Sequence, residues 1–199
     1  RHNFPLHNFR RLAPLLHRIR VVKTPMEQDL LRKAAEITDK GFRRILEFVE
    51  PGVTEYEIEA ELIHEYTRNR GAFAYNPIIA TGKNACILHY LENDQTCRKG
   101  QLLLMDVASS YANYNADLTR TIPVSGKFSR RQKDVYNAVL RVMRACIDGA
   151  TIGKKHSDWQ KESQLMMNEE LLQLGLITPK DIKKQDPDNM ACRKYFMHG

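Results

Sequence analysis

The sequence predicts a protein of the α/β class (α+β), with helices packed on a mainly antiparallel sheet. Two observations lead to this prediction. Helical patterns with clear start and stop signals occupy residues 24–71, before any strand signal. An apolar run at 102–106 and a β-branched run at 117–121, joined by a short polar stretch, then indicate two strands connected by a turn.

The helical part begins with two well-marked segments. A capping box at 24–27, with proline at the first helical position, starts a helix that ends before the Pro-Gly pair at 51–52. A second capping box at 54–57 starts another helix, which Gly71 ends. Two long helices before the first strand favour a helix-on-sheet architecture.

The remaining elements follow in order. Residues 73–79 predict a strand that Pro77 interrupts, and a turn at 81–84 leads to His89. Beyond the paired strands, helices are predicted over 129–149 and 157–175. The charged stretch 180–189 is interpreted as an exposed loop.

Two aspartates, Asp106 and Asp117, are the most informative residues. Asp106 closes an apolar run, and its burial would need a counter-charge, for which Arg120 is a candidate, although a surface ion pair would explain Arg120 equally well. A turn centred near 111–112 would place the aspartates directly opposite each other, with Cβ atoms roughly 4.5–5.5 Å apart. Such a pair can clamp two metal ions about 3.5–4 Å apart. From spacing alone, two solvated aspartates beside a hairpin turn remain the other interpretation.

Three short motifs give this pair a context: ILHYLEN at 87–93, DLTRTIPVSGKF at 117–128 and FMHG at 196–199. In that order and at those distances they resemble the catalytic domain of aminopeptidase P, the Xaa-Pro aminopeptidases of the pita-bread metallopeptidase superfamily. The resemblance runs from about Ile19 to Gly199. It implies that residues 24–199 are the N-terminal part, the first half, of a pita-bread catalytic domain with a curved sheet.

The resemblance also implies a role for each motif residue. Asp106 and Asp117 match two metal-binding aspartates, and Asp117 matches the one whose carboxylate bridges two divalent ions. His89 and His198 match active-site histidines that lie beside the substrate without binding metal, so they are the candidate catalytic and substrate-binding residues. The resemblance favours manganese as the metal, and a mixed carboxylate and imidazole site is also compatible with zinc or cobalt.

The resemblance requires more metal ligands than the chain contains. The family's other ligands are a histidine four residues past the position of His198 and two later glutamates, and the chain ends at Gly199. Two carboxylates are too few to hold two ions in fixed geometry. We therefore expect this chain to be an inactive fragment of a longer enzyme. Between the aspartates, Ala108, Asn113 and Ala116 stand where the family commonly has glycine, so the backbone of the turn can differ.

The expected activity of the complete enzyme is metal-dependent release of the N-terminal residue from peptides with proline in second position. Proline forms a tertiary amide without an N–H, and its fixed φ excludes general peptidases. Prolidase, an Xaa-Pro dipeptidase of the same superfamily, is one alternative. The other is a non-catalytic pita-bread module that binds peptides or histones. Such modules usually lose the metal ligands, whereas Asp106 and Asp117 are both present here.

The net charge of +7 is concentrated at the start of the chain. Residues 1–26 hold six basic and no acidic side chains, and the remainder is nearly neutral. A nucleic-acid-binding protein would need a concentrated basic patch on its folded domain, so we expect no nucleic-acid partner. We interpret residues 1–23 as a basic linker from a mostly missing N-terminal domain.

Cysteine usage and hydropathy indicate the cellular compartment of the protein. Its four cysteines are widely spaced without a C-x-x-C pair, which predicts reduced thiols and a cytoplasmic protein. No apolar run approaches the roughly 18 residues of a membrane span, so no membrane partner is expected. The expected partner is a peptide substrate, and the complete protein is expected to be a homo-oligomer.

Overall fold

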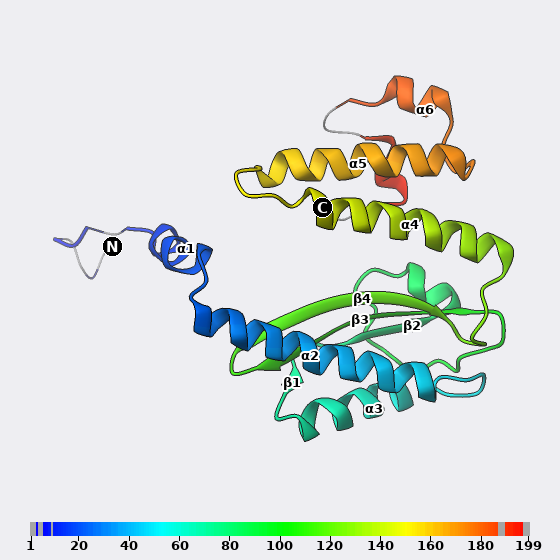
Figure 1. Ribbon diagram of the computed structural model, residues 1–199, viewed down its shortest axis with the longest axis horizontal. Coiled ribbons are helices and arrows are strands. Elements are labelled where there is room, and N and C mark those ends of the chain that lie inside the picture. The colour runs from blue at the N-terminus through cyan, green and yellow to red at the C-terminus, as the bar shows by residue number, and fades with distance from the viewer. Residues whose placement is uncertain (1–2, 4–5, 9, 187–189, 197–199) are drawn as a thin grey trace. The chain divides into compact units, whose positions relative to one another are not determined.

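The structure is a computed structural model, which describes residues 3, 6–8, 10–186 and 190–196. The chain divides into two compact units, Arg1–Lys127 and Phe128–Gly199. Figure 1 shows the helices and strands with the labels used below. The first unit contains the sheet, and with it three of the four candidate site residues: His89, Asp106 and Asp117.

Three helices open the first unit: α1 (Ala13–Val21), α2 (Pro25–Phe48) and α3 (Glu55–Arg68). Both predicted capping boxes are confirmed. The backbone N–H of Thr24 donates to the Glu27 carboxylate at 2.7 Å, and that of Thr54 donates to the Glu57 carboxylate at 2.8 Å. These local bonds satisfy backbone amides at the helix starts, which explains why the sequence marks both starts so clearly.

The described sheet is antiparallel and has four strands: β1 (Ala72–Phe73), β2 (Ile78–Thr81), β3 (Leu102–Tyr111) and β4 (Tyr114–Pro123). Strand β3 is central, because it pairs with β4 along one edge and with β1 and β2 along the other. The interrupted strand expected at 73–79 is two strands, and Pro77 lies in the break because proline has no N–H for a ladder. A short 3-10 helix, η1 (Gly82–Cys86), follows β2.

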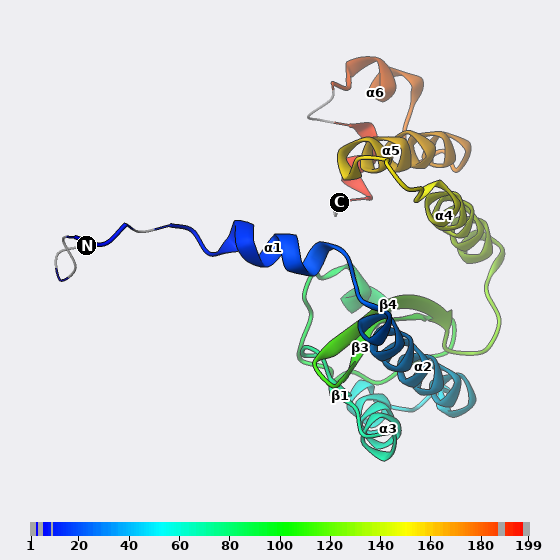
Figure 2. The same cartoon turned by 60° about the vertical axis from the view of Figure 1, so that its left-hand side comes forward.

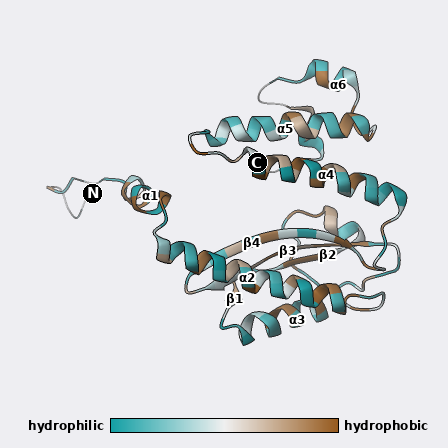
Figure 3. Ribbon diagram, in the orientation of Figure 1, coloured by the Kyte–Doolittle hydropathy of each residue, from teal (hydrophilic) through white to brown (hydrophobic). Residues whose placement is uncertain are grey.

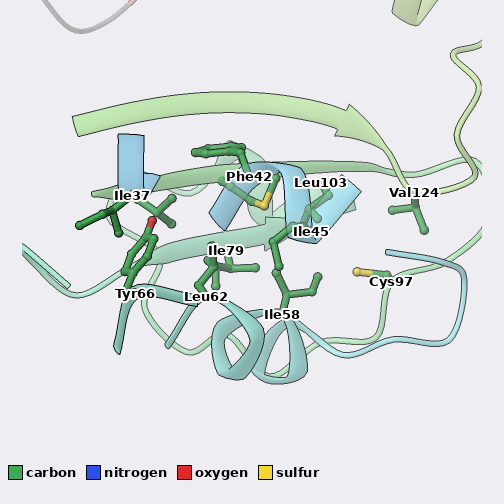
Figure 4. Packing of buried hydrophobic residues seen from close by; sticks show 12 residues of the cluster. Ile37, Phe42, Ile45, Ile58, Leu62, Tyr66, Ile79, Cys97, Leu103 and Val124 are labelled. Carbon is green, nitrogen blue, oxygen red and sulfur yellow. The ribbon is translucent and has the colours of Figure 1, made fainter. Parts of the chain in front are cut away.

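Helices α2 and α3 cover one face of the sheet (Figures 1 and 2). The core between them is made of fully buried apolar side chains, including Ile45 of α2, Leu62 of α3 and Leu103 of β3 (Figure 4). Figure 3 shows the same division by hydropathy, with brown segments along the strands and mixed colours on the two helices. The predicted helix-on-sheet architecture is confirmed.

Gly41 of α2 lies directly against two side chains of α3. A Cβ atom at this position would lie 2.7 Å from Cε1 of Tyr66 and 3.0 Å from Cδ2 of Leu62. Both distances are shorter than ordinary carbon contacts, so a larger residue would push the helices apart. The two helices can therefore share one layer over the sheet because this position lacks a side chain.

The second unit consists of α4 (Arg130–Gly149), α5 (His156–Gln173), α6 (Pro179–Lys184) and the 3-10 helix η2 (Ala191–Lys194). The predicted helices at 129–149 and 157–175 are confirmed. The exposed loop expected at 180–189 is wrong for its first half, because a capping box between Thr178 and Asp181 starts α6. Residues 187–189 lie outside the described residues.

Candidate metal centre

The turn of the β3–β4 hairpin fixes the positions of the two aspartates. Its central residues, Ala112 and Asn113, have φ angles of 48° and 66°, as tight two-residue hairpin turns require. Asp106 therefore pairs with Thr119, two residues beyond Asp117. The predicted direct opposition of the aspartates is wrong, because the turn lies one residue later than expected. A turn that is one residue later shifts the residue opposite Asp106 by two positions, from Asp117 to Thr119.

A shift of two residues leaves both aspartates on the same face of the hairpin, since strand side chains alternate between faces. The two aspartates are diagonal neighbours across the strand pair, and the Cα atoms of such residues are roughly 7–8 Å apart. Met105 and Val107, which alternate with Asp106, are fully buried in the core under α2 and α3. The carboxylates thus lie on the sheet face that these helices do not cover.

Tyr75 connects the two carboxylates. Its hydroxyl lies 2.6 Å from Oδ1 of Asp106 and 2.8 Å from Oδ1 of Asp117. The backbone positions it, because the N–H of Ala74 donates to the carbonyl of Ala108 on β3 at 3.0 Å. Burial, together with the two carboxylates, raises the pKa of the Tyr75 phenol, so it stays protonated and can donate. Sequence reasoning missed this residue, because neither its spacing nor its neighbours mark it.

In the part of the chain that the structure describes, the carboxylate pair has no cationic ion-pair partner. Arg120 donates to the backbone carbonyl of Thr119 at 2.8 Å, and it stands an odd number of residues from Asp117, on the opposite face of the strand. The prediction that Arg120 is the counter-charge of Asp106 is therefore wrong.

The two predicted histidines are placed differently. His89 is exposed in the loop between η1 and β3, where it has a φ of 54°. His198 lies outside the described residues. Within the described ranges, no group of three or more His, Cys, Asp and Glu side chains converges as a metal site. This chain's described contribution to such a site is the carboxylate pair, and the roles of His89 and His198 stay predictions.

The pair fits a divalent cation. Two carboxylates share one face with a single hydroxyl between them, and like charges so placed favour a positive ion. Carboxylate oxygens are hard ligands suited to manganese and acceptable to zinc. The hydrogen bond from the Tyr75 hydroxyl resembles those that orient the metal-binding carboxylates of metalloproteins from outside the metal site.

Comparison with known families defines the class of this protein. The family model described as metallopeptidase family M24 matches residues 29–199. The chain belongs to this family.

Several individual relatives are named as Xaa-Pro aminopeptidases. The chain is 37% identical to the Xaa-Pro aminopeptidase of Haemophilus influenzae, over 94% of this chain and 43% of that protein, and 37% identical to the Xaa-Pro aminopeptidase of Escherichia coli, over 94% and 42%. Zinc-substituted E. coli aminopeptidase P in complex with product superposes with a TM-score of 0.85 at 36% identity, over 94% of this chain and 42% of that one. The pita-bread fold is confirmed, and the chain spans less than half the length of these relatives.

Proposed function

We propose that the complete protein is a metal-dependent aminopeptidase that releases the N-terminal residue from peptides with proline in second position. One observation carries the proposal: Asp106 and Asp117 share a sheet face, linked by one hydroxyl and without a cationic partner in the described chain. Membership of metallopeptidase family M24 and similarity to Xaa-Pro aminopeptidases support it.

In this proposal each site residue has a distinct task. Asp106 and Asp117 would hold the divalent ions, while the hydrogen-bonding hydroxyl of Tyr75 orients both carboxylates. His89 lies beside the substrate and hydrogen-bonds the peptide, since an imidazole can donate or exchange a proton near neutral pH. His198 helps to hold the peptide as its carbonyl carbon becomes tetrahedral. The remaining ligands would come from residues outside this chain.

When bound, a pair of divalent ions lowers the pKa of water and polarises a carbonyl, which is the chemistry that peptide hydrolysis requires. The protein would supply the substrate's orientation. The bond before proline needs this arrangement, because its tertiary amide offers no N–H for a general peptidase to hold.

We propose manganese as the metal, with zinc or cobalt as possible substitutes. Carboxylate ligands accept all three ions, and the zinc-substituted relative shows that one similar protein takes zinc. Metal analysis of the purified complete protein by mass spectrometry would identify the ion.

Two further features of the proposal concern the protein's surroundings. A cytoplasmic location is supported by its cysteines, which are all unpaired thiols in the structure. Within the described residues, no helix has the length and apolar character to cross a membrane.

Residues 1–23 are proposed as a linker, and the absence of any buried residue in α1 supports this.

A panel of three peptides tests the proposed specificity. The complete protein should release Xaa from Xaa-Pro-Yaa tripeptides, cleave Xaa-Pro dipeptides poorly and leave Xaa-Ala-Yaa nearly intact. Preference for the dipeptide would establish prolidase instead. Binding without turnover of any peptide would support the non-catalytic module, which the retained Asp106 and Asp117 disfavour.

A further inference from the structure

The stretch 87–96 around His89 is exposed except at two anchored residues, Tyr90 and Asn93. Ile87, Leu88 and Leu91 are about half exposed, and His89 is also exposed. Tyr90, directly after His89, is by contrast only 5% exposed. The direction of the His89 side chain therefore depends on how Tyr90 is held.

His89 also needs such an anchor for its backbone. Its φ of 54° lies in the left-handed region, which L-residues rarely adopt and which costs them free energy. Residues keep such conformations only when the surrounding structure holds them. The second anchor, Asn93, has a similar φ of 47°, and its side chain accepts from the N–H of Ile79 and donates to the carbonyl of Pro77.

Tyr90 is held by a fully buried carboxylate, that of Glu55. The Tyr90 hydroxyl donates to Oε2 of Glu55 at 2.8 Å. The same carboxylate accepts from the N–H of Thr81 at 2.6 Å and from the N–H of Gln95 at 3.0 Å. Glu55 therefore joins the first residue of α3 to the end of β2 and to two residues that follow His89 in its loop.

These bonds explain how a carboxylate is tolerated in the core. Glu55 is 0% exposed and forms no ion pair in the part of the chain that the structure describes. Three donors and the N-terminus of α3 stabilise its charge instead. Burial, and then the bond to Glu55, raises the pKa of Tyr90 to about 12, so the phenol keeps its donating proton throughout the neutral range.

We propose that Glu55 and Tyr90 are positioning residues, which fix the loop backbone so that His89 points at the substrate. This rests on the proposed function, in which His89 contacts the peptide. The metal-binding carboxylates are held separately, by β3, β4 and Tyr75. Disturbing the Glu55–Tyr90 bond should therefore change what His89 contributes and leave metal binding intact.

A double-mutant cycle in the complete protein tests this. Tyr90→Phe removes one hydroxyl and keeps the ring, and Tyr56→Phe is the matched control, because Tyr56 is a 57% exposed tyrosine on α3. We expect Tyr90→Phe to lower kcat/KM for a Xaa-Pro-Yaa peptide roughly 10- to 100-fold, with unchanged metal content. In a His89→Ala background the same change should have almost no effect, because the residue through which Tyr90 acts is gone.

Two results would overturn the proposal. If Tyr90→Phe multiplies the loss caused by His89→Ala, Tyr90 acts independently of His89. If it matches wild type, the hydroxyl positions nothing. Glu55→Gln should reproduce the pattern of Tyr90→Phe, and it serves as the second variant if Tyr90→Phe does not fold.

Hydrogen exchange supplies a readout that needs no activity. In Tyr90→Phe, amides of residues 82–95 should exchange faster while those of β3 and β4 keep wild-type rates. Unaltered exchange across 82–95 would also overturn the proposal. If the wild-type protein cleaves no Xaa-Pro peptide, the proposed function fails, and the exchange experiment alone decides whether Glu55 and Tyr90 hold the loop.

Discussion

Replacing Tyr75 with phenylalanine isolates the hydrogen bond that links the carboxylates of Asp106 and Asp117. The phenol has one proton, so it makes one full bond or shares it between Asp106 at 2.6 Å and Asp117 at 2.8 Å. A hydrogen bond to a charged acceptor contributes about 1.5–3 kcal/mol. Because Asp117 is exposed and Asp106 is half-buried, water can replace part of the bond. We therefore expect the lower end, a loss of about 1.5 kcal/mol in the free energy of unfolding.

Urea unfolding of this chain in the presence of a chelator, followed by circular dichroism, measures the loss. The midpoint should fall while the slope with denaturant stays constant, since little buried surface changes. Tyr56→Phe again serves as the control and should stay within about 0.5 kcal/mol of wild type. Equal stability of the Tyr75→Phe and Tyr56→Phe variants would show that the Tyr75 hydroxyl does not hold the pair.

Three other predictions address the metal, the core and the assembly. Calorimetric titration of this chain alone with manganese should show one weak site at most, because Asp106 and Asp117 supply too few ligands; two tight sites would contradict it. Gly41→Ala should destabilise the chain by about 1–3 kcal/mol in the same urea assay, because its Cβ would lie 2.7 Å from Tyr66, and wild-type stability would refute the close packing of α2 and α3. Sedimentation of the complete protein should reveal a homo-oligomer, and a monomer at all concentrations would exclude it.

Local signals in the sequence were sufficient for most of the fold. The capping boxes at 24–27 and 54–57 predicted both long helices, because each start is fixed by bonds between residues three apart. The same signal stands at 178–181, where Thr178 and Asp181 start α6. The capping box there outweighs the charged composition that predicts a loop.

The site was only partly predictable. The face shared by the two aspartates follows from strand alternation, but their register depends on the turn, and Asn113 tolerates a positive φ better than most residues. Tyr75 is separated from Asp106 by 31 residues and from Asp117 by 42 residues. Contacts over such separations are made by the sheet as a whole, so no local pattern indicates them. The buried Glu55 carboxylate is likewise bound by residues 26 to 40 positions away in sequence, which no local pattern indicates.

Peptide release by the complete protein, before and after metal removal, tests the central claim most directly. Chelation should abolish release of the N-terminal residue from a Xaa-Pro-Yaa peptide, and added manganese should restore it. In Asp117→Asn manganese should restore nothing, because a neutral amide binds a divalent cation more weakly than a carboxylate does. Activity that survives thorough chelation, or wild-type turnover by Asp117→Asn, would contradict a metal centre built on Asp106 and Asp117.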